Sequence, residues 1–189
     1  ARHARGTALV VPGNHDDKLR RHLAGRRVQL THGLEASVAQ LARETPAFRA
    51  AVHDFLDALP THLRLAGDAL LVAHAGLAQP LHGRSGPRVR DFVLYGQTTG
   101  ELDAHGLPVR LDWAADYHGT TLVAYGHTPV ATPRRVHATI NLDTGCVFGG
   151  ALTALRWPEG EFASVPAVRE YVPSRRPFLP RHGVAVPTG

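Results

Sequence analysis

Ala69-Leu70-Leu71-Val72-Ala73, followed directly by His74, is a short apolar run that ends in a histidine. The same order occurs twice more, at residues 7–11 before Gly13-Asn14-His15-Asp16 and at residues 121–125 before Gly126-His127. Apolar runs of this length bounded by turn residues are typical of buried strands. In α/β folds, the carboxyl ends of the strands carry the ligands and the chemistry. The sequence therefore predicts an α/β fold with Asn14, His15, His74 and His127 at the ends of strands.

The side chains that follow these three runs indicate a metal centre. An asparagine oxygen and neutral imidazoles suit a borderline or hard divalent cation, such as Mn, Ni, Fe or Zn. A single histidine would be weak support, because the chain contains 13 of them. The repetition of one strand-then-ligand pattern is what favours metal binding.

The same segments resemble a known superfamily. Residues 13–16, 72–77 and 125–129 are similar to the third, fourth and fifth motifs of the calcineurin-like binuclear metallophosphoesterases. The resemblance implies a β-sandwich flanked by helices (αββα), with two divalent cations in a complete domain. It also implies that Asn14, His74 and His127 bind the second cation, that His15 is the general acid or a phosphate contact, and that Asp16 orients it. Two cations would clamp the phosphate and produce hydroxide, while a protonated imidazole meets the leaving oxygen.

Further segments narrow the resemblance. Residues 31–35, 94–96, 109–114 and 141–150 are similar to the phosphatase module of bacterial polynucleotide kinase-phosphatase, and the likeness runs from about residue 9 to about residue 166. It implies removal of a terminal phosphate or a 2',3'-cyclic phosphate from RNA ends during RNA repair, with Mn or Ni as the cofactor. Kinase and ligase-type modules would accompany the phosphatase in the parent chain.

Two motifs of the superfamily have no counterpart in the sequence. These are Asp-x-His-Gly and Gly-Asp-x-x-Asp-Arg-Gly, which supply the ligands of the first metal, the bridging aspartate and a phosphate-binding arginine. We therefore expect a fragment without the amino-terminal part of its domain. Such a fragment would hold metal weakly and would be impaired in catalysis.

Residues 81–119 are rich in turn formers, and Asp103-Ala104-His105-Gly106 is typical of a hairpin turn. Irregular loops above a sheet edge often shape a substrate pocket. The candidates for contacting a base or ribose are Tyr95, Arg110, Asp112 and Trp113, which could equally hold the local fold together.

Residues 139–142 read as a strand that delivers Asp143 to its end. Asp143 could orient His127 or His74, as partners of metal ligands often do, or it could cap the turn at residues 143–145. Both interpretations stay open at this point.

Helices are expected at residues 19–25 and 36–59, with Thr45 as an N-cap before Pro46. Short strands are expected at residues 28–30 and 151–157, the latter as the final strand of a sandwich of two sheets. Residues 1–166 would form one domain, and residues 167–189, which contain Pro173, Pro177, Pro180 and Pro187, a linker or tail.

Composition limits the partners and the compartment. The 189-residue chain has a formal charge of +5, and Lys18 is its sole lysine. Arginine suits phosphate geometry, so the pairs at 20–21, 26–27, 134–135 and 175–176 could follow a nucleic-acid backbone or simply form solvated faces. Cys146 is the single cysteine, which favours a cytoplasmic setting, and no apolar stretch is long enough to predict a membrane helix.

Two alternatives to RNA repair remain. A dinucleoside tetraphosphate hydrolase or a serine/threonine phosphoprotein phosphatase would share the third to fifth motifs. The second alternative is a noncatalytic remnant or an RNA-binding piece, which would not need a complete metal site.

Overall fold

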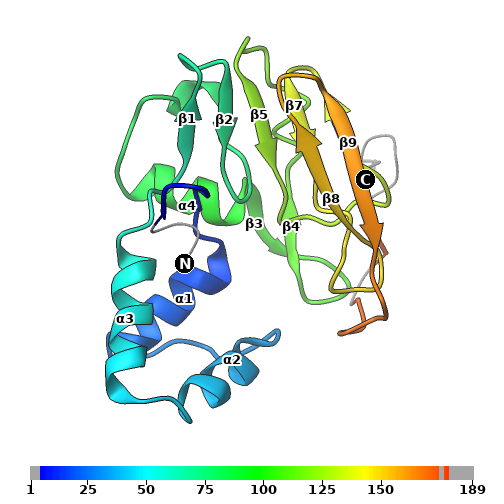
Figure 1. Cartoon of the computed structure of the whole chain (residues 1–189). Helices are drawn as coiled ribbons and strands as arrows, with labels where there is room; N and C mark the ends of the chain where they lie inside the picture. The colour runs from blue at the N-terminus through cyan, green and yellow to red at the C-terminus, as the bar shows by residue number, and fades with distance from the viewer. Residues whose placement is uncertain (1–4, 175–176, 179–189) are drawn as a thin grey trace. The chain divides into compact units, whose positions relative to one another are not determined.

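The computed structural model describes residues 5–174 and 177–178. These residues belong to two compact units, the first ending at Leu63 and the second beginning at Arg64 (Figure 1). Each unit is described here by itself. The predicted α/β class is confirmed by the helices and sheets that they contain.

The first unit contains three helices, α1 (Asn14–Leu23), α2 (Leu34–Leu41) and α3 (Pro46–Asp57). The predicted start of α3 is confirmed, because the Thr45 side chain accepts a hydrogen bond from Phe48 N at 3.2 Å and Pro46 occupies the first turn. At α1, the Asp16 carboxylate accepts from Gly13 N at 2.8 Å. This bond satisfies a donor at the helix start and fixes where α1 begins.

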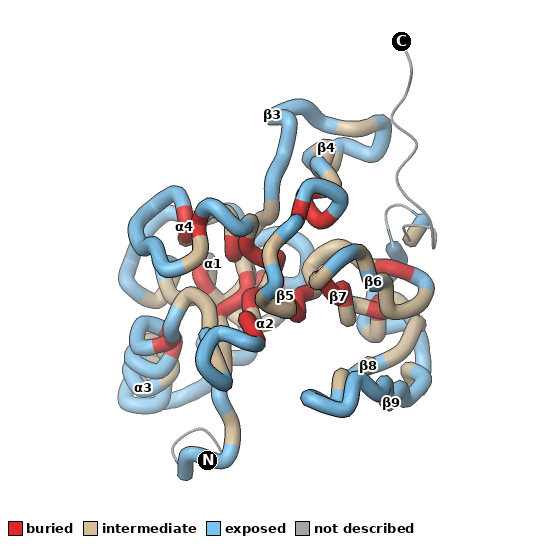
Figure 2. The backbone as a smooth tube through the Cα atoms, turned by 90° about the horizontal axis from the view of Figure 1, so that it is seen from above, coloured by how far each residue is buried: buried red, intermediate tan, exposed pale blue. Residues whose placement is uncertain are grey.

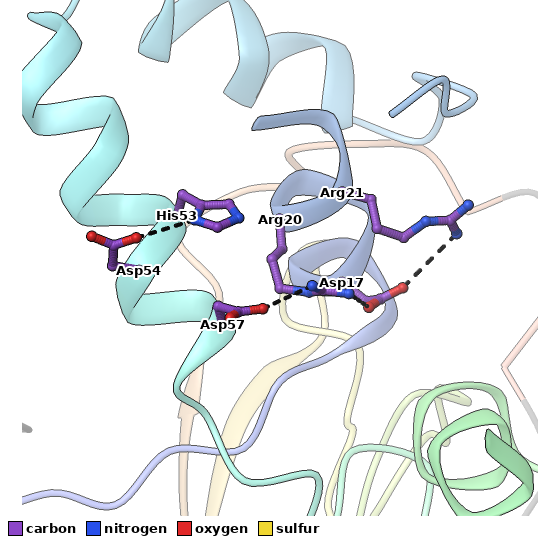
Figure 3. A network of polar contacts seen from close by, with 6 residues as sticks. All are labelled: Asp17, Arg20, Arg21, His53, Asp54 and Asp57. Carbon is purple, nitrogen blue, oxygen red and sulfur yellow. Dashed lines mark hydrogen bonds and ion pairs between the residues drawn. The ribbon is translucent and has the colours of Figure 1, made fainter. Parts of the chain in front are cut away.

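A polar network ties α1 to α3 (Figure 3). Arg20 donates to Asp57 Oδ1 at 2.8 Å and to Asp17 Oδ1 at 3.2 Å. Asp17 is 6% exposed, so its carboxylate needs such partners to remain charged. Arg21 Nη1 lies 4.0 Å from the second oxygen of Asp17. Arg20 is therefore the principal cation between the two helices.

The strands predicted at residues 7–11 and 28–30 are wrong. In the described part of the first unit, no strand precedes residue 63, and Leu9 is 58% exposed. The helix predicted from residue 19 instead begins at Asn14. A short apolar run becomes a strand only where a neighbouring strand pairs with it, and here Gly13 and Asp16 start a helix soon after the run.

The second unit is built on a five-stranded sheet with the order β1-β2-β5-β7-β6. Its strands are β1 (Leu63–Leu65), β2 (Leu70–Val72), β5 (Leu122–Tyr125), β6 (Arg134–Val136) and β7 (Thr139–Asn141). β5 runs parallel to both β2 and β7, and β6 is antiparallel to β7. The strands predicted at residues 69–73, 121–125 and 139–142 are thus confirmed. Leu71, Val123 and Ile140 are at most 1% exposed, as central parallel strands require.

A helix that was not predicted, α4 (Pro87–Tyr95), supplies part of the core, and a short 3-10 helix, η2 (Gln79–Leu81), precedes it. Val89 and Val93 of α4 are buried with Leu71 and Val123 of the sheet in one cluster. The buried segments, red in Figure 2, gather around α4, β5 and β7. Gly86 and Gly96 cap the two ends of this short helix, and these turn-forming residues made the segment resemble an irregular loop in the sequence.

Two hairpins complete the second unit. β3 (Thr98–Leu102) pairs with β4 (Pro108–Arg110), and Figure 2 shows this hairpin projecting from the sheet. Its predicted turn is confirmed, because Asp103 Oδ1 accepts from the backbone N–H groups of His105 and Leu107, both at 2.9 Å. β8 (Ala151–Arg156) pairs with β9 (Glu161–Pro166). The strand at 151–157 is therefore confirmed, but the prediction that it is the last strand is wrong.

The segment after Pro166 returns to the loop before β8. Ala167 N donates to Gly150 O at 2.8 Å, and Tyr171 N donates to Val147 O at 3.0 Å. The arginine pair at 175–176 and the prolines at 180 and 187 lie outside the described residues. A linker or tail over residues 167–189 stays a prediction. No helix within residues 5–174 and 177–178 is long and apolar enough to cross a membrane.

Candidate functional site

Two of the predicted site histidines meet at the ends of neighbouring strands. His74 follows β2 by two residues and His127 follows β5 by two residues, and the two strands are parallel neighbours. His74 Nε2 lies 2.9 Å from His127 Nδ1. The backbone joins them as well, because Gly126 N donates to His74 O at 2.8 Å. The structure thus brings these two imidazoles together.

The His74–His127 pair fits a divalent cation in its donor chemistry. Two neutral imidazoles with facing nitrogens are ligands that Mn, Ni, Fe and Zn accept. Among the residues that the structure describes, no group of three or more His, Cys, Asp and Glu side chains could hold a metal ion. Further donors would have to be of another kind, such as an amide oxygen or water. Metal binding by the pair stays a prediction.

The other predicted residues of the metal and acid site lie in the first unit. Asn14 and His15 are the first two residues of α1, and the Asp16 carboxylate is bonded to Gly13 N at the start of the same helix. Burial lowers the pKa of His15, and the charges of Lys18 and His32 lower it further. The convergence of Asn14 with the two histidines, and the roles of His15 and Asp16, remain predictions.

Asp143, which comes two residues after β7, serves the turn that follows it. Its Oδ1 accepts from Gly145 N at 3.1 Å, and its own N–H donates to Asn141 Oδ1 at 2.9 Å. Burial raises the pKa of Asp143, while hydrogen bonds from the backbone N–H groups of Gly145 and His127 act in the opposite direction. Asp143 therefore caps the turn and also holds the backbone of His127. Orientation of an imidazole ring by Asp143 stays a prediction.

A cavity of about 290 Å³ adjoins the histidine pair within the second unit. His127 lines it together with all four predicted substrate contacts, which are Tyr95, Arg110, Asp112 and Trp113. The ring centroids of Trp113 and Tyr125 lie 4.9 Å apart in its wall. Residues from the β3–β4 hairpin and from the ends of β5 and β7 form a further part of the lining. The cavity combines aromatic surface with a few charged groups, as ligand sites commonly do.

Arg134 is a cavity residue that sequence reasoning missed as a site candidate. It donates from Nη1 to Asp112 Oδ1 at 3.0 Å and makes a second hydrogen bond from Nη2 to Asp112 Oδ2. This bond to Asp112 raises the pKa of Arg134, and Tyr125 contributes a further hydrogen bond. In the sequence, Arg134 appeared only as half of a basic pair with Arg135. Its partner Asp112 is 22 residues away, so no local signal distinguished the two arginines.

Gly76, in the same motif as His74, allows the wall of the cavity to pack closely. Its φ is +86°, and a Cβ atom there would lie 2.0 Å from Cζ2 of Trp113. No side chain fits in that space. Arg110, another lining residue, donates from Nη1 to the carbonyl of Tyr95. The positions of Trp113 and Arg110 are therefore fixed by backbone groups.

Comparisons with known proteins identify relatives over most of the chain. The chain is 48% identical over 175 residues to a bis(5'-nucleosyl)-tetraphosphatase PrpE [asymmetrical] from Geobacillus sp. strain WCH70, covering 90% of this chain and 71% of the relative. The protein of the same name from Halalkalibacterium halodurans is 50% identical over 165 residues, covering 85% and 67%. A crystal structure provisionally described as a diadenosine tetraphosphatase matches with a TM-score of 0.60 and 30% identity, covering 87% of this chain and 70% of that one. No family model matches the chain.

These relatives correct the functional interpretation. They are named for dinucleoside tetraphosphates, so the prediction of RNA end healing by a polynucleotide kinase-phosphatase module is wrong. They agree with the alternative, a dinucleoside tetraphosphate hydrolase. The motifs around Asn14, His74 and His127 occur throughout the superfamily, and for that reason they could not discriminate between substrates.

Proposed function

This chain belongs to the bis(5'-nucleosyl)-tetraphosphatase PrpE family, whose members are metallophosphoesterase-type enzymes, and on that premise we propose that it hydrolyses a dinucleoside tetraphosphate asymmetrically. The products are a nucleoside triphosphate and a nucleoside monophosphate. The observation that carries the proposal is that His127 belongs both to the histidine pair and to the lining of the cavity. A group that could bind a phosphate-coordinating ion thus adjoins a space suited to a nucleoside.

The metal would be a divalent cation, Mn or Ni, held by His74 and His127 of the second unit, and a ligand role for Asn14 stays a prediction. Bound there, such an ion supplies Lewis-acid stabilisation of a phosphoryl oxygen and lowers the pKa of water. The protein contributes two imidazoles held against each other at 2.9 Å. A general-acid role for His15 stays a prediction, and burial, which lowers the pKa of His15, works against the protonated form that such a role needs.

The cavity would hold substrate through its aromatic and guanidinium groups. Trp113 and Tyr125, which are largely buried, would contribute the exposed parts of their rings to contact with a base. Arg110 presents a planar fork that suits phosphate oxygens. Asp112 holds Arg134 from two atoms, so that guanidinium is oriented before substrate arrives.

The test is a substrate panel in the presence of Mn²⁺ or Ni²⁺, with products separated by ion-exchange chromatography. Diadenosine tetraphosphate should be converted to ATP and AMP faster than either RNA ending in a cyclic phosphate or a phosphopeptide is hydrolysed. Release of ADP alone, or preference for either other substrate, would contradict the proposal. His127→Ala should abolish the reaction, whereas His105→Ala, on the exposed turn between β3 and β4, should not.

A further inference from the structure

We propose that the cavity beside His127 receives one nucleoside end of the substrate and that the second nucleoside stays outside it. The enzyme then selects dinucleoside polyphosphates by one end. This inference rests on the proposed function and adds to it a statement about which part of the substrate is recognised.

The size of the cavity is the first argument. Its volume is about 290 Å³, and pockets that enclose one drug-sized ligand measure roughly 300–1,000 Å³. A single nucleoside is a ligand of that size class. A dinucleoside tetraphosphate carries two nucleosides and four phosphates, which is far more than this volume encloses.

The chemistry of the lining is the second argument. Trp113 and Tyr125 form one aromatic wall, with ring centroids 4.9 Å apart, and the lining contains no second aromatic pair of this kind among the described residues. Because Trp113 and Tyr125 are 7% and 9% exposed, the wall offers one small aromatic surface, which is enough for at most one base.

The charged pair in the lining suits a ribose next to that base. Arg134 and Asp112 neutralise each other through two hydrogen bonds, and their side chains are 12% and 25% exposed. A carboxylate can accept about four hydrogen bonds, so Asp112 keeps the capacity to accept from ribose hydroxyls while Arg134 holds it. The neutralised pair also avoids repelling the phosphates that follow the ribose.

One-ended recognition has a direct consequence for substrate range. A nucleoside 5'-tetraphosphate offers the same base, ribose and phosphate chain to this cavity as a dinucleoside tetraphosphate does. Removal of the far nucleoside costs no contact in the cavity. The kcat/KM for the nucleoside 5'-tetraphosphate should therefore lie within about tenfold of the kcat/KM for the dinucleoside tetraphosphate.

The experiment compares diadenosine tetraphosphate with adenosine 5'-tetraphosphate on the full chain and on two matched variants. Val109→Phe enlarges a lining side chain of β4, while Leu102→Phe enlarges a side chain of β3 that is 68% exposed and lies outside the lining. Val109→Phe should lower kcat/KM for both substrates by the same factor, about tenfold or more and mainly through KM. Leu102→Phe should change neither value by more than about twofold.

The outcomes separate the inference from the proposed function. Failure of the unaltered chain to hydrolyse either substrate would overturn the proposed function. Hydrolysis of diadenosine tetraphosphate with a kcat/KM more than about tenfold above that of adenosine tetraphosphate would overturn the inference alone, because it would show recognition of the second nucleoside.

A binding measurement without metal tests the same cavity independently of catalysis. The chain has two tryptophans, and Trp157→Phe leaves Trp113 as the reporter. AMP should quench the fluorescence of Trp113, and the added substitution Val109→Phe should weaken this binding about tenfold or more, while Leu102→Phe should not. Absence of quenching, or equal affinities in the two variants, would overturn the inference.

Discussion

His74 Nε2 and His127 Nδ1 lie 2.9 Å apart, although 53 residues separate them in the chain. The parallel pairing of β2 with β5 explains this, because Val72 is in register with Ala124 and each histidine emerges just beyond its strand. His127 has a φ of +73°, a left-handed conformation that costs a non-glycine residue about 1–3 kcal/mol. The fold retains this cost at the position where the two imidazoles meet, which agrees with a functional role for the pair.

Replacement of either histidine by alanine should weaken binding of Mn²⁺ by about tenfold or more, measured by isothermal titration calorimetry. The double variant should bind little worse than either single variant, because both side chains serve one ion. His105→Ala is the matched control and should bind as the unaltered chain does. Additive losses in the double variant would mean that the two histidines serve different ions.

Gly76→Ala should lower the free energy of unfolding by about 2–4 kcal/mol, because the new methyl group would collide with Trp113 and φ is unfavourable. Gly106→Ala is a control with a φ of +71° and open space around its Cβ position, and it should cost only about 1 kcal/mol. Urea denaturation gives both values. Equal losses would show that close packing against Trp113 adds nothing to the effect of backbone conformation.

The pair of Arg134 and Asp112 should show a coupling energy of about 1–3 kcal/mol in a double-mutant cycle with Arg134→Met and Asp112→Asn. Both side chains are largely buried, so water screens them little. The pair of Arg156 and Glu161 has exposures of 69% and 64%, and its coupling should be below about 1 kcal/mol. Unfolding in urea measures both cycles, and a larger coupling at the exposed pair would contradict this account.

In the first unit, Arg20→Met should destabilise the fold by about 1–3 kcal/mol, because buried Asp17 would lose its nearest cation (Figure 3). Arg21→Met should cost less than about 1 kcal/mol, since Arg21 lies 4.0 Å from Asp17 and is 47% exposed. Thermal unfolding of the two variants provides the comparison. Similar losses would argue against Arg20 as the principal link between α1 and α3.

Stability should fall at alkaline pH because burial raises the pKa of Tyr117. Below the usual phenol pKa of about 10, the hydroxyl is neutral in both the folded and the unfolded chain, and the contribution to stability is complete. Above that pH, the unfolded chain ionises first, so the free energy of unfolding decreases as pH rises. Urea midpoints measured on both sides of this pH should drop less steeply for Tyr117→Phe. An unchanged slope would show that Tyr117 does not contribute.

The parts of the fold that were predictable are those with a strong local pattern. β2 and β5 are continuous apolar runs buried in a central sheet, and Thr45 with Pro46 marks the start of α3. By contrast, every residue of β9 is exposed, and its pairing with β8 is what makes it a strand. Strand formation of that kind depends on the neighbouring strand, so the sequence of β9 alone could not reveal it.

The candidate site, like the fold, could be predicted only in part from the sequence. His74 and His127 could be placed together because strands deliver them, and the four predicted substrate contacts do line one cavity. Arg134 could not be assigned, because its role depends on Asp112 from another segment. The substrate could not be read from motifs that the whole superfamily shares, and the relatives were needed to correct it.

The central claim is that His74 and His127 bind one and the same metal ion. Anomalous diffraction from crystals of the Mn²⁺-loaded protein tests it most directly. We expect one anomalous peak about 2.0–2.3 Å from a ring nitrogen of each histidine. A metal peak bonded to only one of them, or located away from both, would contradict the claim.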